Sequence, residues 1–181
     1  MRRILVTGVN GQLGRCIEKI SDDFSGMEFE FHTSETLDIT DAEKISSIFS
    51  KGNFDYCINC AAYTNVEQAE KTPEIAFKVN AEGVKHLAES CLKNNTVLVH
   101  ISTDYVFDGA KEEPYTVNDT PNPINEYGKS KWEGEKYIQK ILKEYFIIRT
   151  SWLYSKKFGK NFYKTILDKA RKGEILKVTN E

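Results

Sequence analysis

The fold is decided by residues 4–14, ILVTGVNGQLG, in which a short apolar run leads into a turn with glycine at every third position. The apolar run predicts a buried strand, and a helix is expected directly after the turn. Gly8 permits a tight turn off the strand, Gly11 lets the backbone approach a pyrophosphate, and Gly14 lets the helix pack close to the sheet. Free N–H groups and the positive dipole end at the start of that helix favour a bound phosphate. The stretch therefore predicts a dinucleotide-binding unit whose cofactor contacts are Gly8, Gly11, Gln12, Leu13 and Gly14.

Beyond this unit, strands and helices alternate along the chain. Apolar runs predict further strands over residues 29–32, 55–60, 96–101, 145–150 and from 175 to 178. Amphipathic stretches predict helices over residues 15–20, 42–50 with Asp41 as N-cap, 74–92, from Tyr127 to about 143, and 160–171 with Phe162, Ile166 and Leu167 inward. This alternation is typical of an α/β fold, a Rossmann-type doubly wound parallel sheet with helices on both faces.

Composition agrees with a single soluble domain. The chain has 181 residues, of which 40% are hydrophobic and 29% charged. No apolar run approaches the ~18 residues of a membrane span, and the two basic and three apolar residues before Thr7 predict a first strand rather than a secretion signal. We therefore expect a cytoplasmic protein without a membrane partner.

Charge is distributed unevenly along the chain. Residues 129–181 carry fourteen Lys+Arg and six Asp+Glu, although the formal net charge is -2. This basic segment could attract an anionic ligand such as a diphosphate, but a solvated lysine-rich helix surface is the interpretation we favour. Aromatic residues do not interleave with these lysines as they do in nucleic-acid-binding proteins, so no nucleic-acid partner is expected.

The four cysteines and three histidines give no metal-binding pattern. Cys57 and Cys60 form a C-x-x-C pair, but residues three apart on a strand point to opposite faces. They cannot easily hold one metal ion together, and no second pair completes a zinc site. The sequence predicts four buried thiols, structural histidines and no metal.

Tyr127 and Lys131 form the most informative polar pair. Four residues apart on a helix, they share one face, and an ammonium beside a phenol favours the phenolate and lowers the pKa of the tyrosine. Such a pair can give a proton to a carbonyl oxygen or take one from an alcohol. Taken alone, it is more often a solvated helix surface, so its meaning depends on the surrounding site.

That site is expected at the carboxyl end of the strand over residues 96–101. Ligands bind beyond the carboxyl ends of strands in open parallel sheets, and Thr103 follows this strand closely. Its hydroxyl could bond a substrate carbonyl, or it could merely start a turn. The loop 108–124, with Pro114, Pro121 and Pro123, is expected to flank the substrate pocket.

Cofactor choice stays open at this point. Glu35 follows the second strand and could bind the adenosine ribose, whereas Arg15 could meet a 2′-phosphate. NADH and NADPH are therefore both possible cofactors. The small residues Ala61 and Ala62, next to Tyr63, would let a flat ring lie against the backbone.

Six ordered stretches together carry a family resemblance: TGVNGQLG, CINCAAYTNVEQAE, VNAEGVKHLAE, ISTDYVFDG, EEPYTVNDTPNPINEYGKSKWEGE and IIRTSWLYS. The chain resembles the extended short-chain dehydrogenase/reductase superfamily and, within it, the dTDP-4-dehydrorhamnose reductase family. The resemblance implies that NAD(P)H reduces the C4 ketone of a dTDP-linked 6-deoxy-hexulose to give dTDP-L-rhamnose.

The resemblance also implies roles for single residues. Tyr127 would protonate the new alkoxide, Lys131 would lower the pKa of Tyr127 and hold the nicotinamide ribose, and Thr103 would bind the ketone oxygen. Further cofactor contacts would be Asp38 and Ile39 at the adenine, with Ala61, Ala62 and Tyr63 lining the site. The implied substrate contacts are Thr103, Asp104, Tyr105, Val106 and Trp152.

Related functions differ in their residues at this site. Nucleotide-sugar dehydratases place an Asp-Glu pair after the threonine, whereas here Asp104 is followed by Tyr105, so elimination would lack an acid/base partner. Epimerases use the same tyrosine and lysine and stay open. A non-catalytic NADP-binding regulatory subunit also stays open, although the intact Thr103, Tyr127 and Lys131 set argues against it.

Length is where the chain departs from the family pattern. Family members continue for roughly another 100 residues as a smaller substrate-binding lobe, whereas 181 residues make about one domain. We expect a single NAD(P)-binding domain over residues 1–181, with the start of that lobe from about residue 175. The expectation is a chain that binds NAD(P)H and reduces the sugar slowly or not at all, with a homodimer as the assembly.

Overall fold

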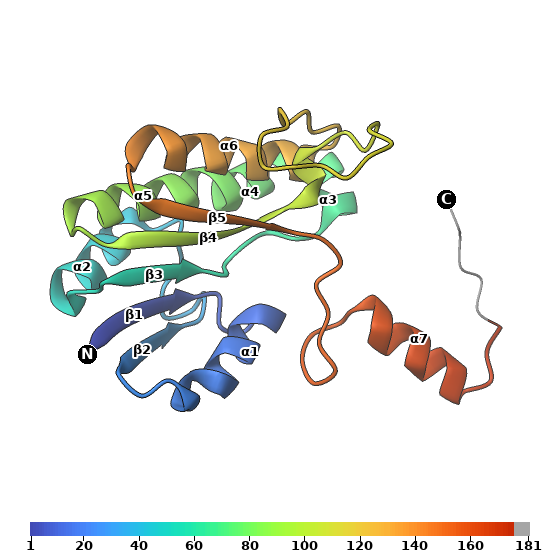
Figure 1. Cartoon of the computed structure of the whole chain (residues 1–181), viewed down its shortest axis with the longest axis horizontal. Coiled ribbons are helices and arrows are strands. Elements are labelled where there is room, and N and C mark those ends of the chain that lie inside the picture. Colours follow the sequence, from blue (N-terminus) through green and yellow to red (C-terminus); the bar gives the residue numbers. More distant parts are fainter. Residues whose placement is uncertain (176–181) are drawn as a thin grey trace.

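The computed structural model describes residues 1–175, which form a five-stranded parallel sheet with the strand order β2-β1-β3-β4-β5. Figure 1 shows the strands side by side, from β5 at the top to β2 at the bottom, with α4, α5 and α6 above them and α1 below. The strands are β1 Arg2–Thr7, β2 Met27–His32, β3 Tyr56–Asn59, β4 Val97–Thr103 and β5 Tyr145–Thr150. This is the Rossmann-type arrangement expected from the alternation of elements.

The described residues also form seven α-helices and three 3₁₀- or π-helical turns, which lie between the strands and after β5. The helices are α1 Gln12–Ile20, α2 Ala42–Gly52, α3 Val66–Lys71, α4 Pro73–Phe77, α5 Val84–Lys93, α6 Glu126–Ile141 and α7 Phe162–Arg171. The turns are η1 Ser21–Asp23, the π-helical η2 Lys78–Gly83 and η3 Asp104–Val106. Asp41 caps α2 as predicted, since its side chain accepts a hydrogen bond from Lys44 N at 2.9 Å.

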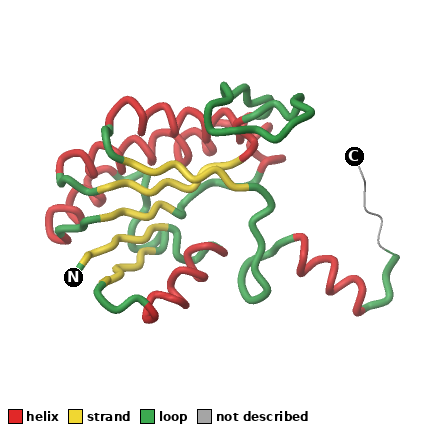
Figure 2. Tube along the Cα trace, in the orientation of Figure 1, coloured by secondary structure: helices red, strands yellow, loops and turns green. Residues whose placement is uncertain are grey.

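The two faces of the sheet are covered unequally. The larger hydrophobic core lies between the sheet and the helices α2, α5 and α6, and it includes Phe49, Leu87 and Leu98. On the other face, α1 covers a smaller cluster around Val6 (Figure 2). Alternation along β4 points Leu98, His100 and Ser102 toward the larger core, and the two polar side chains reach α6. His100 and Ser102 of β4 therefore contribute polar groups to the interface with α6.

Several predicted elements differ in detail. The helix predicted over residues 74–92 is divided by the π-helical turn into α4 and α5, and Ile75 is half exposed rather than inward. Helix α3 was not predicted. Cys57 and Cys60 do lie on opposite faces of the sheet, but only Cys57 and Cys91 are buried, so the prediction of four buried thiols was wrong.

The carboxyl-terminal part of the described chain packs loosely. Helix α7 lies apart from the sheet in Figure 1 and has no buried residue; Phe162 is 49% exposed, although it was predicted to point inward. Asn161 Nδ2 connects this region to α1 by donating to Gln12 Oε1 at 2.7 Å. The strand predicted from residue 175 to 178 lies outside the described residues except for Ile175, which is exposed.

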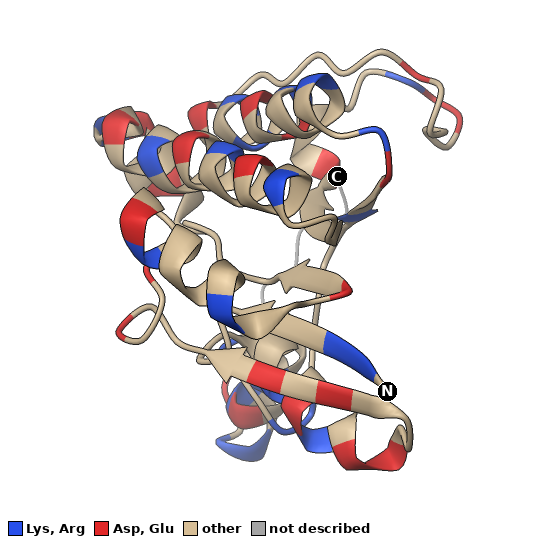
Figure 3. Cartoon of the chain, turned by 90° about the vertical axis from the view of Figure 1, so that its left-hand side faces the viewer, with Lys and Arg blue, Asp and Glu red and all other residues tan. Residues whose placement is uncertain are grey.

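Charged residues of both signs are interspersed along the helices seen in Figure 3. Lys129–Glu126 and Lys136–Glu133 pair within α6 at 2.6 and 2.5 Å. This pattern is that of a solvated surface rather than a single basic patch. Among the described residues, no helix combines the length and the apolar character that a membrane crossing needs.

Candidate active site

The glycine-rich turn after β1 lies directly against the end of β3. Gly8 has φ +69°, and a Cβ at this position would lie 2.5 Å from Ala61 N. A Cβ on Gly14 would lie 2.6 Å from Val9 Cα, so α1 packs closely on the turn. Gly11 is the N-cap of α1 and offers no side chain to its N–H groups. The turn therefore allows a phosphate group to approach the backbone closely, and the start of α1 leaves its N–H groups free to bind it.

The segment after β3 is held by a buried asparagine on the π-helical turn. Asn80 Oδ1 accepts from Tyr63 N at 2.9 Å, and Asn80 Nδ2 donates to Tyr63 O and Ser130 Oγ, both at 3.0 Å. The predicted cofactor-lining residues Ala61, Ala62 and Tyr63 are partly buried and lie beside the glycine turn. Asn80 thus fixes this segment relative to α6.

The expected adenine contacts differ from each other in exposure. Asp38 is exposed, and its Oδ1 accepts from Thr40 N at 2.9 Å. Ile39 is 3% exposed and packs against Gly83, so its side chain belongs to the core and only its backbone can meet a ligand. Glu35 and Arg15 are both exposed, which leaves both cofactor predictions in place.

Tyr127 lies in the first turn of α6, next to Asn125, the N-cap whose side chain accepts from Gly128 N at 2.7 Å. The Tyr127 ring packs edge-on against the Tyr105 ring at 5.7 Å. Burial raises the pKa of Tyr127, the neighbouring Thr103 hydroxyl opposes this rise, and the charge of Asp104 adds to it. The phenol therefore stays protonated at neutral pH.

Thr103 is the last residue of β4 and is almost fully buried. Its hydroxyl donates to Asp104 Oδ1 at 3.1 Å and accepts from Tyr105 N at 3.2 Å, so it also caps the turn η3. Thr103 therefore starts a turn, which was one of the two alternatives, and it lies beside the Tyr127 phenol at the carboxyl end of the sheet.

Lys131 points into the interface between α6 and β4. Its Nζ donates to Ile101 O at 2.7 Å and lies 3.3 Å from His100 Nε2, with only 1% of the residue exposed. Burial lowers the pKa of Lys131 to about 8, against opposing effects of Glu135 and Cys60. The expectation that Lys131 lowers the pKa of Tyr127 was wrong for this structure, because burial dominates at Tyr127 and the ammonium is directed at β4.

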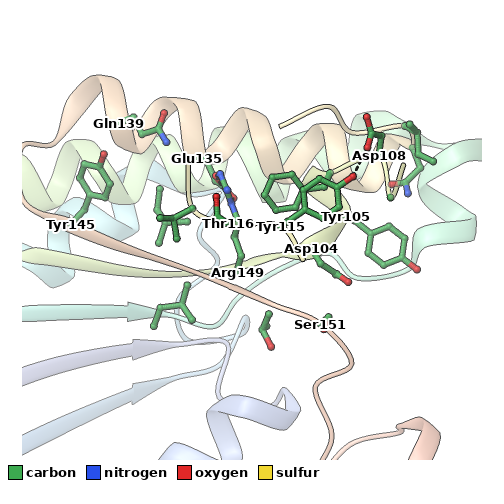
Figure 4. Close-up of a pocket in the computed structure, with 18 residues that line it drawn as sticks. Asp104, Tyr105, Asp108, Tyr115, Thr116, Glu135, Gln139, Tyr145, Arg149 and Ser151 are labelled. Atoms are coloured by element: carbon green, nitrogen blue, oxygen red, sulfur yellow. Dashed lines mark hydrogen bonds and ion pairs between the residues drawn. The ribbon is translucent and has the colours of Figure 1, made fainter. Parts of the chain in front are cut away.

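A cleft of about 980 Å³ lies between the loop before α6 and strand β5 (Figure 4). Its lining begins at Asp104, the residue after Thr103, and does not include Thr103, Tyr127 or Lys131. Asp104 and Tyr105, two predicted substrate contacts, line it, and the loop contributes Tyr115 and Thr116.

Val106 was also predicted to contact substrate, but its side chain is fully buried and cannot do so. Trp152 is 74% exposed, lies outside this lining, and packs edge-on against Phe162.

Arg149 and Glu135 form one wall of the cleft. Arg149 pairs with the fully buried Glu135 at 2.6 Å, and Ser102 Oγ donates to the same carboxylate at 2.5 Å. The guanidinium also lies 5.0 Å from the centre of the Phe107 ring, which stacks on Tyr115 in the loop. A partly buried arginine, paired with a buried carboxylate, thereby anchors the loop that flanks the cleft.

Sequence reasoning missed three of these polar residues. Asn80, His100 and Glu135 are each fully buried, and each bonds a residue more than 10 positions away. A polar residue inside an otherwise apolar segment, such as His100 in the run 96–101, was the one available signal. No cluster of metal-ligating side chains occurs within residues 1–175.

Comparison with known proteins gives a consistent set of relatives. The sequence profile of the RmlD substrate binding domain matches residues 1–181. A dTDP-4-dehydrorhamnose reductase from Aggregatibacter actinomycetemcomitans is 42% identical over 98% of this chain and 60% of its own length.

Two crystal structures of dTDP-4-dehydrorhamnose reductases are also similar. The protein from Clostridium acetobutylicum superposes with a TM-score of 0.89 at 40% identity, over 94% of this chain and 60% of that one. The protein from Bacillus anthracis, in complex with NADP, gives 0.89 at 38% identity, over 95% and 61%. The chain thus spans about 60% of the length of these relatives.

Proposed function

The chain belongs to the RmlD substrate binding domain family, and on this premise we propose that it serves the NAD(P)H-dependent reduction of the C4 ketone of dTDP-4-dehydro-6-deoxy-L-mannose to dTDP-L-rhamnose. The observation that carries the proposal is the meeting of Thr103, from the end of β4, with Tyr127, from the first turn of α6. Relatives named dTDP-4-dehydrorhamnose reductase support this choice of substrate.

The residues around the glycine turn fit a bound dinucleotide. The turn at Gly8 leaves no room for a side chain against Ala61, and α1 begins without a capping side chain. In this proposal its N–H groups hold the pyrophosphate, and Ala61 to Tyr63 line the nicotinamide side. When bound, NAD(P)H supplies the hydride.

Tyr127 is the proton donor in this proposal. Reduction of a ketone leaves an alkoxide that needs one proton, and a phenol whose pKa is raised by burial still carries its proton at neutral pH. The Thr103 hydroxyl, beside that phenol, bonds the same oxygen and orients it. Asp104 and Tyr105 continue from Thr103 into the cleft, where the sugar would lie.

Lys131 stands one helical turn after Tyr127 and is assigned to the nicotinamide ribose. Its pKa of about 8 leaves it mostly charged at pH 7, so its remaining N–H groups can donate to ribose hydroxyls. The choice between NADPH and NADH rests on the exposed pair Arg15 and Glu35. The NADP complex of the Bacillus anthracis relative favours NADPH.

Three finer points are proposed with the function. The chain acts in the cytoplasm, as a homodimer, and without nucleic acid. The cytoplasmic location is supported by the four cysteines, all of which are free, because thiols stay reduced in the cytoplasm. Support against nucleic acid is the mixture of charges on the helices (Figure 3).

The test is incubation of the chain with NADPH and dTDP-4-dehydro-6-deoxy-L-mannose, with the chain in excess so that slow conversion is still detected. Loss of NADPH absorbance with formation of dTDP-L-rhamnose supports the proposal. A UDP-linked sugar of the same type, run in parallel, reports the specificity for the nucleotide. Epimerised sugar with unchanged NADPH, or NADPH binding without any conversion of sugar, would contradict the proposal.

A further inference from the structure

A chain of buried polar groups leads from the glycine turn to Lys131. Thr7 Oγ1 donates to Asn59 Oδ1 at 2.6 Å, Asn59 Nδ2 lies 3.0 Å from His100 Nδ1, and His100 Nε2 lies 3.3 Å from Lys131 Nζ. Thr7, Asn59 and His100 are fully buried, and Lys131 is 1% exposed. Water therefore cannot form hydrogen bonds with these groups, so each of them must bond another group of the chain.

The direction of these hydrogen bonds is fixed at Asn59. Ala61 N donates to Asn59 Oδ1 at 3.1 Å, and a backbone N–H can only donate. The Asn59 oxygen must therefore face Ala61 and Thr7, so the Asn59 amide nitrogen faces the imidazole. That nitrogen is a donor, which makes His100 Nδ1 an acceptor.

An imidazole that accepts at Nδ1 carries its proton on Nε2 when it is neutral. His100 is neutral, because burial and then the charge of Lys131 hold its pKa well below the ordinary value. Its Nε2–H consequently points at Lys131 Nζ. An ammonium there meets the positive end of an N–H, whereas a neutral amine can accept the hydrogen bond through its lone pair.

The other groups around Lys131 are known from the structure. Ile101 O accepts from Nζ, the carboxylate of Glu135 on α6 and the thiol of Cys60 after β3 favour the charged form, and Tyr127 lies one turn earlier on α6. Glu135 is itself engaged by Arg149 and Ser102. His100 is therefore the polar neighbour that opposes the ammonium, together with burial.

We propose that Asn59 and His100 are positioning residues that set the charge of Lys131: Asn59 fixes the imidazole with its proton on Nε2, and this N–H favours the neutral amine. The proposal rests on the proposed function only in that Lys131 there binds the nicotinamide ribose. A lysine held in this way exchanges its proton close to neutral pH, one turn of α6 after Tyr127.

The test is a pH titration of the chain labelled with ¹³C at lysine Cε, followed by NMR without cofactor or sugar. The Lys131 signal is identified by its absence in Lys131→Met. In the wild type we expect a midpoint of about 8. In His100→Gln, where a freely rotating amide can turn its oxygen toward Nζ, the midpoint should rise by about one pH unit or more.

His86→Gln is the matched control, because it makes the same chemical change in a histidine of α5 that makes no contact with Lys131 in the hydrogen-bond network. It should leave the Lys131 midpoint unchanged. An unchanged midpoint in a folded His100→Gln would overturn the proposal. If that variant does not fold, ¹⁵N NMR of the wild-type histidines decides: a proton on His100 Nε2 supports the proposal, and a proton on Nδ1 overturns it.

The outcome is separable from that of the proposed function. A shifted Lys131 midpoint in a chain that reduces no sugar would leave this assignment standing and remove the proposed reaction. Turnover of the sugar with an unshifted Lys131 midpoint in His100→Gln would support the proposed reaction and overturn the role assigned to Asn59 and His100.

Discussion

Asn80 Nδ2 donates a hydrogen bond to Ser130 Oγ across 3.0 Å and thereby connects the π-helical turn to the helix that carries Tyr127. The same amide bonds both the N–H and the carbonyl of Tyr63. One buried side chain thus holds the proposed cofactor-lining segment and α6 in a fixed relation. In a regular α-helix this asparagine would lie at a different position, and the π-helical turn brings it to the observed one. Such π-helical turns are frequent at functional sites.

Asn80→Asp should therefore loosen the site. The change removes two donors and leaves a carboxylate buried against the Tyr63 carbonyl, so we expect the free energy of unfolding to fall by about 2–4 kcal/mol. Urea unfolding measures this loss. Asn65→Asp is the control, because Asn65 caps α3 and aspartate caps equally well, with an expected change within about 0.5 kcal/mol. Equal losses in the two variants would contradict the assigned role.

Gly8→Ala tests the contact between the glycine turn and β3. Its new methyl group would meet Ala61 N at 2.5 Å, and the positive φ adds strain, so stability should fall by at least about 2 kcal/mol. NADPH affinity, followed by nicotinamide fluorescence, should fall at least about tenfold, because the turn is displaced from the pyrophosphate.

Gly173→Ala separates these two causes. Gly173 has nearly the same φ, +68°, but nothing lies within 4 Å of its Cβ position. It should cost about 1 kcal/mol from backbone strain alone and leave NADPH binding intact. A Gly8→Ala variant that matches Gly173→Ala in both measurements would show that the predicted clash is absent.

Lys131→Met tests the buried charge through the pH dependence of stability. Because the pKa of Lys131 is lowered to about 8 in the folded chain, the ammonium is unfavourable below pH 8, and this cost is relieved as pH rises toward its ordinary value of 10.5. Relative to Lys131→Met, the wild type should gain about 2 kcal/mol between pH 8 and pH 10. Chemical unfolding at several pH values checks this gain, and Lys140→Met, at an exposed position on α6, should show a flat difference.

Local sequence patterns were sufficient for the sheet and for the glycine turn. Strand β5 was predicted with its observed bounds, since an apolar run that follows the charged residues Lys143 and Glu144 defines it without long-range contacts. The tight turn at Gly8 and the close packing at Gly14 were predicted from the glycine spacing, and both positions leave no room for a Cβ.

Contacts between distant segments decided what the sequence could not. The helix over residues 74–92 is divided at a π-helical turn in which Asn80 bonds Tyr63 and Ser130, contacts that no local pattern reveals. The pKa of Tyr127 rises rather than falls because its burial depends on the neighbouring elements, and Lys131 is directed at β4. Val106 is buried because the turn η3 folds it inward, although its neighbours Asp104 and Tyr105 face the cleft.

The role of Tyr127 as proton donor is tested by comparing Tyr127→Phe with Tyr137→Phe, the same change made on a tyrosine ten residues later on α6. Each chain is mixed in excess with dTDP-4-dehydro-6-deoxy-L-mannose and NADPH, and both NADPH binding and the formation of dTDP-L-rhamnose are followed. We predict that both variants bind NADPH as the wild type does, that Tyr137→Phe converts the sugar at the wild-type rate, and that Tyr127→Phe forms no product. Conversion by Tyr127→Phe at the wild-type rate would contradict the account.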